Sequence, residues 1–299
     1  MSLLTVGALA LSGCGGKTTN ETTKTANVSV SNDTSLHGQL PAAIKSKGSL
    51  SMASDASYAP NEFTNDGGKT FQGFDIDLAN AIGTKLGVKI VVSNAQFDGI
   101  LAGVNSGRFD FSMSSFTDNK TREKQNDFVT YFTAGTSIGV KKGNPKNINS
   151  QDDLCGLKVA AEKGSTQEDA LTKLKYDDGS PTLAGTCKSK GKRAPIPVSL
   201  PNQNGVNQAV IAGRADAFIS DSPVVDYQVK QQNGEIVQGG ETTDRVPYGV
   251  AFAKGSPLAP IFQKAITALI ADGSYTKIIN AWGLTDGAVT ESKMNGAAG

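Results

Sequence analysis

Apolar residues recur with two spacings from residue 49 onward: every second position in short runs, and every third or fourth position in longer ones. The first spacing is typical of half-buried strands and the second of amphipathic helices. Residues 74–86 predict a helix, with Asp75 as its cap and Gly87 as its end, and a further helix capped by Asp98 ends at Gly107. The short runs predict strands at 50–52, 88–92 and 107–115. Strands and helices in turn indicate an α/β fold.

The same order of elements returns after residue 153, and a phrase from the first series is repeated within it. Gly107, Arg108, Asp110 and Ser114 each recur 106 positions later, in the stretch GRADAFISD at 213–221. Both copies follow an apolar helical run and begin a strand at a turn glycine. The repeat predicts two similar lobes, each with a central sheet flanked by helices.

Each copy of this strand ends in polar residues, Ser114 and Ser115 in the first and Ser220 and Asp221 in the second. In open α/β sheets, ligands bind beyond the carboxyl ends of the strands. Polar groups placed there by both lobes would face each other across a cleft. Ser and Asp are also common in ordinary turns, so the pattern alone leaves a purely structural account open.

The N-terminal segment has the pattern of an export signal. An apolar run at 3–11 is too short to span a bilayer, and LSGC at 11–14 resembles the lipobox of bacterial lipoprotein signal peptides. Residues 1–13 are expected to be that signal peptide, with a truncated start because no Lys or Arg precedes the apolar run, and Cys14 is expected to be lipidated. Residues 14–48, rich in Thr, Ser and Asn, are expected to form a flexible tether to the extracellular face of the cell membrane or the periplasm.

Charge, histidine and cysteine content narrow the function. The 299 residues include 29 Lys and Arg against 28 Asp and Glu, a net charge of +1 that provides no global field for nucleic acid. The single histidine, His37, lies in a polar segment and argues against histidine-based catalysis or a metal site, and no cofactor is expected. Cys155 and Cys187 are an even pair in an exported chain. A disulfide, worth roughly 3 to 4 kcal/mol, is favoured over free thiols.

Several motifs stand in a fixed order between about residues 49 and 285. They are DASYAP at 55–60, GFDIDLA at 73–79, FDG at 97–99, SSFT at 114–117 with Arg122 after it, GSTQ at 164–167, and ADA at 215–217 leading to Asp221. Together they resemble the bacterial extracellular solute-binding proteins for polar amino acids, family 3, which are the receptor components of ABC importers.

The resemblance implies a two-lobed periplasmic-binding-protein-like fold of type II, in which hinge strands join lobes that close over an amino acid. Lobe 1 is expected to comprise residues 49–140 and 246–285, lobe 2 residues 141–245, and 286–299 a C-terminal tail. The crossover strands are expected near 136–140 and 246–252. The resemblance also implies an ABC transporter permease as partner, and the chain is expected to be a monomer.

The resemblance further assigns contacts to the ligand. The clamp for the α-carboxylate falls on Arg122, whose planar guanidinium meets a carboxylate through two bonds, and the acceptor for the α-ammonium falls on Asp221. The GSTQ stretch precedes a helix, so its free N–H groups favour an anion, although Thr166 could equally be only the helix cap. The remaining implied contacts are Asp55, Tyr58, Asn61, Phe97, Ser114, Ser115, Thr117, Glu162, Ser165, Thr166 and Gln167.

Within that set, Tyr58 and Phe97 are the implied aromatic walls, and Asp55, Asn61 and Glu162 line the far end of the pocket. Two carboxylates there suit a cationic or amide side chain and would repel an acidic one. Structural alternatives stay open: the aromatic rings could be core, and Glu162 could face solvent.

Two other functions share the fold. Some periplasmic dehydratases have it, but no Ser-His-Asp or Cys-His set is present in the sequence. A sensor that reports to a membrane kinase would use the same residues. The motifs favour a binding protein without catalytic residues.

Overall fold

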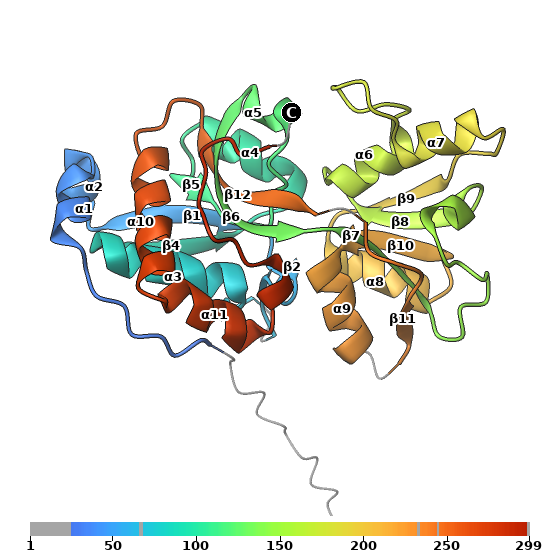
Figure 1. The fold of residues 1–299 in the computed structure, drawn as a ribbon, viewed down its shortest axis with the longest axis horizontal. Helices are drawn as coiled ribbons and strands as arrows, with labels where there is room; N and C mark the ends of the chain where they lie inside the picture. The colour runs from blue at the N-terminus through green and yellow to red at the C-terminus, as the bar shows by residue number, and fades with distance from the viewer. Residues whose placement is uncertain (1–24, 66–67, 232–233, 244, 298–299) are drawn as a thin grey trace, which may run out of the picture.

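The computed structural model describes residues 25–65, 68–231, 234–243 and 245–297, which form two α/β lobes side by side (Figure 1). Each lobe has its own sheet, and helices cover both faces of each sheet. A short hairpin of β2 (Ser57–Tyr58) and β3 (Glu62–Phe63) projects from the first lobe toward the second. The predicted pair of α/β lobes is therefore present.

The first lobe is built on a five-stranded sheet. Its elements are β1 (Ser49–Ser54), β4 (Lys89–Asn94), β5 (Phe111–Ser112), β6 (Asn126–Ala134), β12 (Val246–Ala253), α3 (Phe74–Leu86), α4 (Phe97–Asn105), α5 (Lys120–Glu123), α10 (Ala259–Ala271) and α11 (Ser274–Trp282). The strand order is β4, β1, β5, β12, β6, with β1 parallel to β4 and β5, and β12 antiparallel to β5 and β6. Helices α3, α10 and α11 bury their apolar sides on one face, and α4 packs on the other.

The second lobe repeats this plan. Its elements are β7 (Thr136–Lys141), β8 (Lys158–Glu162), β9 (Ile196–Leu200), β10 (Ala217–Asp221), β11 (Ile236–Gln238), η1 (Gln151–Leu154), α6 (Thr166–Thr172), α7 (Leu183–Ser189), α8 (Gln203–Ile211) and α9 (Ser222–Gln231). The strand order is β9, β8, β10, β7, β11, again with the first three parallel and β7 antiparallel to its neighbours. Helices α6 and α7 cover one face, and α8 and α9 cover the other.

The repeated sequence phrase occupies equivalent places in the two sheets, at the start of β5 and of β10. In the first copy Asp110 accepts the backbone N–H of Ser51 through Oδ2 at 2.6 Å, and in the second Asp216 accepts that of Lys158 at 2.9 Å. The turn glycine of each copy is left-handed, with φ of 75° and 71°. The shared residues thus fix the same junction between neighbouring parallel strands.

The chain passes between the lobes at two segments that touch. β6 leads through Gly135 into β7, and the chain returns from Thr242 and Thr243 toward β12. The N–H of Thr243 donates to the carbonyl of Thr136 at 3.0 Å, and a Cβ on Gly135 would lie 2.3 Å from the Thr243 carbonyl. The predicted boundary at residue 140 is wrong, because residues 136–140 belong to β7, which pairs with β10 of the second lobe.

Residues 25–48 belong to the first lobe, so the prediction of a tether over 14–48 is wrong for this part. They include α1 (Thr34–Gln39) and α2 (Ala42–Lys47), and Leu36 and Leu40 are buried in the lobe 1 core. The N–H of Ala26 donates to Asp77 Oδ2 at 2.7 Å. A few apolar side chains among many polar ones are enough to anchor the segment. Cys14 and the predicted signal peptide lie outside the described residues.

Four further local predictions can be compared with the fold. Gly87 ends α3 with φ of 66°, as predicted, but Gly73 rather than Asp75 caps this helix, and Gln96 rather than Asp98 caps α4. At the C-terminus, Ser292 donates to the Thr130 carbonyl at 2.8 Å, so the predicted tail packs along β6. Its first turn is η2 (Thr285–Gly287).

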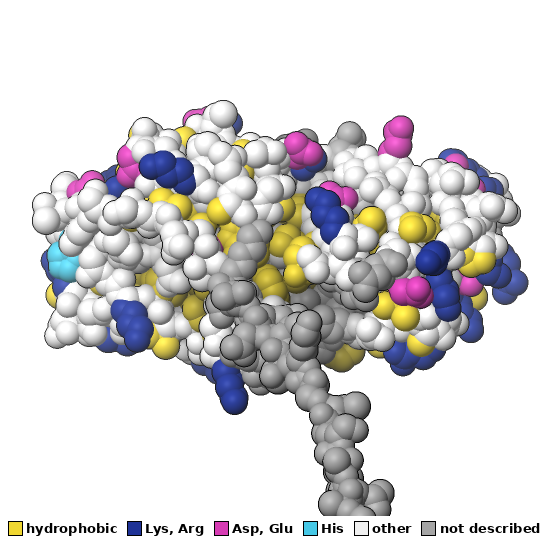
Figure 2. Space-filling model, turned by 90° about the horizontal axis from the view of Figure 1, so that it is seen from below, with side chains coloured by type: hydrophobic (Ala, Val, Ile, Leu, Met, Phe, Trp, Pro, Cys, Tyr) yellow, Lys and Arg dark blue, Asp and Glu magenta, His cyan; other side chains and the backbone are white. Residues whose placement is uncertain are grey.

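The predicted disulfide is present. Cys155, directly after η1, is bonded to Cys187 of α7, with their Cα atoms 5.6 Å apart. The surface seen from below carries both Lys and Arg and Asp and Glu side chains, and several of the Lys and Arg side chains gather at the lobe 2 end (Figure 2). Of the helices in the described ranges, none is both long and apolar enough to cross a membrane.

Candidate ligand-binding site between the lobes

A small pocket lies between the lobes, beyond the carboxyl ends of β8 and β10 and beside the loop that follows β5. Its lining residues are Tyr58, Phe97, Ser115, Thr117, Arg122, Glu162, Ser165, Thr166, Gln167 and Asp221. Every one of them was predicted as a ligand contact. The lobes approach closely enough to leave about 10 Å³ between these side chains, roughly the room needed by one water molecule.

Asp221, the last residue of β10, is buried and linked to both lobes. Its Oδ1 accepts the side-chain amide of Gln167 at 2.7 Å, and its Oδ2 accepts the hydroxyl of Tyr58, from the other lobe, at 2.8 Å. Burial raises the pKa of Asp221, whereas hydrogen bonds from tyrosine and glutamine side chains and the charge of Arg122 lower it. This carboxylate is therefore placed to accept hydrogen bonds from a cation held between the lobes.

Arg122 lies on α5, on the opposite wall from Asp221. Its Nη1 donates to the Thr117 carbonyl at 2.9 Å, and its Nη2 donates across the cleft to the Gly164 carbonyl at 3.1 Å. The guanidinium also lies over Phe116, 5.1 Å from the ring centroid. Burial of the guanidinium lowers the pKa of Arg122 to about 10, so the group remains cationic at neutral pH. Arg122 thus lies at the cleft and not on a solvated helix surface.

The GSTQ stretch turns the chain from β8 into α6. Ser165, and not Thr166, is the cap of this helix, since its Oγ accepts the N–H of Glu168 at 3.1 Å. Thr166 is left to face the cleft, where its Oγ1 lies 3.5 Å from the Oγ1 of Thr117 in the other lobe. Gly164 has φ of 80°, and an added Cβ would come within 2.9 Å of Asp98. The glycine thus allows the two lobes to approach at this point.

The far end of the pocket is acidic. Glu162 ends β8 with 4% exposure, and its Oε1 has no hydrogen-bond donor. Burial, followed by the charge of Asp55, raises the pKa of Glu162 well above its ordinary value. At the rim, Lys163 pairs with Asp98 across the cleft at 2.9 Å. Glu162 thus lines the pocket and does not face solvent.

Phe97 forms an aromatic wall together with a ring that the sequence analysis did not single out. The Phe97 and Phe116 rings stack with centroids 4.3 Å apart and an angle of 18° between their planes. Phe116 is fully buried, whereas Phe97 lines the pocket, so the pair connects the site to the small apolar core under α4.

Three predicted contacts, Asp55, Asn61 and Ser114, lie behind the pocket lining and not in it. Ser114 Oγ accepts the N–H of Asp55 at 2.9 Å, and Asn61 Nδ2 donates to Ser115 Oγ at 2.9 Å. Asp55 in turn accepts the N–H of Phe97 at 3.1 Å. These side chains hold the wall in place, because each bonds to a residue that itself faces the pocket or supports its rim.

Sequence reasoning missed several contacts that span the cleft. The Tyr58 hydroxyl lies 3.0 Å from Ser220 Oγ as well as bonding Asp221, and Ser57 Oγ accepts the N–H of Gln203 at 3.1 Å. The only signal in the sequence was that residue 58 is tyrosine, which has a hydroxyl, and not phenylalanine. The two partners of such a bond are more than 140 positions apart, so spacing could not reveal them.

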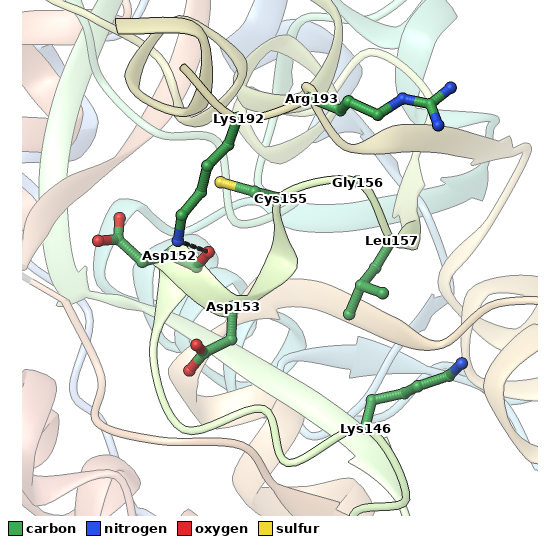
Figure 3. Close-up of a pocket in the computed structure, with 8 residues that line it drawn as sticks. All are labelled: Lys146, Asp152, Asp153, Cys155, Gly156, Leu157, Lys192 and Arg193. Atoms are coloured by element: carbon green, nitrogen blue, oxygen red, sulfur yellow. Dashed lines mark hydrogen bonds between the residues drawn. The ribbon is translucent and has the colours of Figure 1, made fainter. Parts of the chain in front are cut away.

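A larger and more open hollow, of about 480 Å³, lies on lobe 2 beside the disulfide (Figure 3). Its charged side chains carry both signs, and Lys192 already donates to the Asp152 carbonyl at 3.3 Å. Lys146 pairs with Asp216 at 3.8 Å. This hollow therefore lacks the converging polar groups of the cleft. Across the described ranges, no group of three or more His, Cys, Asp and Glu side chains is arranged to hold a metal ion.

Two lobes with matching sheets, two crossover segments and a polar pocket between them define a periplasmic-binding-protein-like protein of type II. In the first sheet β1 lies between β4 and β5, and the returning strand β12 lies between β5 and β6. The chain belongs to the bacterial extracellular solute-binding proteins, family 3, whose pattern it matches over residues 50–285.

Relatives of known name agree with this assignment. The arginine-binding protein ArgT of Corynebacterium glutamicum is 29% identical over 260 residues, covering 87% of this chain and 82% of ArgT. The L-cystine-binding protein TcyA of Bacillus subtilis is 26% identical, covering 93% of this chain and 94% of TcyA. Relatives are thus named as amino-acid-binding proteins.

Solved structures give the same picture. An ancestral arginine-binding protein bound to arginine superposes with a TM-score of 0.69 and 36% identity, covering 79% of this chain and 98% of the other. The ancestral amino-acid-binding protein AncCDT-1, a precursor of cyclohexadienyl dehydratase, has a TM-score of 0.69 and 34% identity, covering 80% of this chain and 97% of the other.

Proposed function

We propose that this protein binds an amino acid with a cationic side chain, arginine being the first candidate, between its two lobes. The observation that carries the proposal is the pairing of opposite charges across one pocket: Arg122 from lobe 1 and Asp221 from lobe 2. An amino acid is a zwitterion. Its carboxylate would replace the Gly164 carbonyl as the hydrogen-bond acceptor of Arg122. Its ammonium would replace the Tyr58 hydroxyl as a hydrogen-bond donor to Asp221. Each exchange replaces a neutral partner with a charged and therefore stronger one.

The acidic end of the pocket supports a cationic ligand side chain. Glu162 Oε1 is buried without a donor, which costs about 1–3 kcal/mol for a polar atom. A guanidinium or ammonium group could donate to this oxygen, and the nearby carboxyls of Asp55 and Asp98 would add to the attraction. The names of relatives, arginine-binding and L-cystine-binding, agree with a ligand that carries a charged or polar end. An amide side chain is the second choice.

The proposed role is that of the extracellular receptor of an ABC importer, which delivers the ligand to a permease. Because ligand contacts come from both lobes, bound ligand would favour the closed form, and its differential affinity for that form limits the shift. We further propose that Cys14 carries the lipid that holds the protein at the outer face of the membrane, and that the protein acts as a monomer without catalytic residues.

Titration calorimetry with arginine, lysine, glutamine and glutamate tests the ligand class. Tight arginine binding is expected, with glutamate the weakest. Arg122→Ala should abolish binding, while Arg108→Ala, which removes an exposed arginine outside the pocket, should leave it unchanged. Binding of glutamate without any basic ligand, or binding that survives Arg122→Ala, would contradict the proposal. Turnover of a cyclic prephenate-like acid would favour the dehydratase alternative instead.

A further inference from the structure

Two carboxyl groups are buried immediately behind the pocket wall, where neither was expected from the sequence. Glu62 of β3 and Asp75 of α3 both have 0% exposure. Glu62 is neighbour to the predicted contact Asn61, and Asp75 is the residue that was expected to cap α3. Neither lines the pocket, so the binding described above makes no direct use of them.

Both carboxyls bond to the pair of serines that follows β5. Glu62 Oε1 accepts the Ser114 hydroxyl at 3.0 Å, and its Oε2 accepts the Ser115 hydroxyl at 3.1 Å. Asp75 Oδ2 accepts the backbone N–H of Ser115 at 3.1 Å and the hydroxyl of Tyr131 at 2.7 Å. Three hydrogen bonds from a two-residue turn therefore end on this pair of carboxyls.

One carboxyl oxygen of the pair has no hydrogen-bond donor. Asp75 Oδ1 is buried without a partner, while both carboxyls bond Ser115 and interact with each other electrostatically. A carboxylate has no hydrogen to donate, so a proton on one of the two carboxyl groups would supply the donor that the site lacks.

The surroundings supply no cation. The titratable groups that face the pair are Tyr131 from β6 and Asp55 from the segment after β1, and neither is basic. No Lys or Arg side chain of the described ranges forms an ion pair with Glu62 or Asp75. Two like charges at this depth cannot both be stable. Burial accordingly raises the pKa of Asp75 to about 7 and that of Glu62 well above its ordinary value.

The geometry points to one proton shared between Glu62 and Asp75. The two carboxyl groups then act as positioning residues for the turn at Ser114 and Ser115 in the wall of the ligand pocket. Ser115 needs such support because it is a non-glycine residue with φ of 52°, a conformation that costs energy unless its surroundings impose it. Gly73 makes the arrangement possible, since a Cβ there would lie 2.1 Å from the Asn61 carbonyl and would push α3 away from β3.

The shared proton can be tested without any ligand. Above the ordinary pKa of carboxyls, the folded pair holds one proton that the unfolded chain has released. The unfolding equilibrium constant should therefore rise about tenfold per pH unit from this pair, until the pair ionises. Glu62→Gln removes that dependence, because the amide can donate to Asp75 permanently. Urea unfolding from pH 5.5 to 8.5 compares the two proteins, with Glu241→Gln, an exposed site, as control.

Infrared spectroscopy gives a direct reading on the wild type. The signal from protonated carboxyl groups at neutral pH should include a component that is missing in both Glu62→Gln and Asp75→Asn but kept in Glu162→Gln, because Glu162 holds a proton of its own. If one of the two variants fails to fold, comparison of the wild-type signal with that of the other variant still tests whether the pair holds a proton. A pH dependence of unfolding that is the same in wild type and Glu62→Gln, or an infrared signal from protonated carboxyls that neither variant reduces, would overturn the inference.

The positioning role rests on the proposed function, and L-arginine is the probe. Glu62→Gln should bind arginine within about threefold of the wild type. Glu62→Ala, which leaves the serine hydroxyls without an acceptor, should bind at least about tenfold more weakly. Equal binding by Glu62→Ala and the wild type would remove the positioning role. If no variant and no wild type binds arginine, the proposed ligand is wrong, but the unfolding and infrared results still stand.

Discussion

Replacing Asp221 by Asn isolates the charge that the proposed ligand ammonium would meet. In the protein as described, Asp221 accepts one bond from Gln167 and one from Tyr58. Asn has the same shape. Its oxygen can accept from the tyrosine, and its amide can donate to Gln167 once that side chain turns its own amide over. Folding stability should therefore change by less than about 1 kcal/mol.

Ligand binding should respond much more strongly than folding. A hydrogen bond to a charged group contributes about 1.5–3 kcal/mol, and removal of one partner from a buried ion pair costs about 3–5 kcal/mol. A loss near 3 kcal/mol for Asp221→Asn corresponds to a Kd for arginine that is about 150-fold higher.

Calorimetry with arginine and thermal unfolding without ligand, run on the same preparations, measure the two effects. Asp286→Asn is a suitable control, because the Asp286 side chain is 88% exposed and does not line the pocket. A folded Asp221→Asn protein that binds arginine within threefold of the wild type would refute the assignment of the ammonium to Asp221.

Three other predictions concern the acidic end, the disulfide and the N-terminal segment. Burial raises the pKa of Glu162, so a cationic ligand side chain must displace the proton on Glu162 to bind there. The affinity for arginine should therefore rise by up to about tenfold per pH unit and level off above the pKa of Glu162. Calorimetry in buffers of different ionisation heat should detect the proton released when arginine binds to the wild type. It should detect no such release for Glu162→Gln. Cys155→Ser with Cys187→Ser should lower the unfolding free energy by about 3 kcal/mol in urea titrations, and equal stability would argue against the bond. Leu40→Ala should cost about 2–5 kcal/mol because Leu40 is buried in the lobe 1 core; a flexible tether would predict no change.

Much of the architecture was predictable because it depends on local patterns. The period of apolar residues located β1, β4, α3 and α4, and the repeated phrase at Gly107 and Gly213 identified equivalent strands. Both copies carry an aspartate whose carboxylate binds the neighbouring strand, so the repeat had a structural cause that spacing alone could reveal. The motif resemblance then supplied all the residues that line the pocket.

The failures share a cause, which is that partners distant in sequence decided the outcome. Asp75 looked like a helix cap from its neighbours, but it faces Glu62 and Tyr131 in the interior. Residues 25–48 looked too polar to fold, yet Leu36 and Leu40 dock on a core formed by later segments. The cleft-spanning bonds of Tyr58 and Lys163 depend on how the lobes sit, which no local pattern encodes.

The docking of residues 25–48 on the first lobe also decides how the molecule would behave when held by its N-terminus. An attachment through the N-terminus, to a lipid or to a biosensor chip, would restrain lobe 1. Lobe 2 would remain free to rotate about the crossover at Gly135. Capture through the N-terminus should thus leave binding kinetics unaltered, whereas capture through side chains on both lobes should slow them.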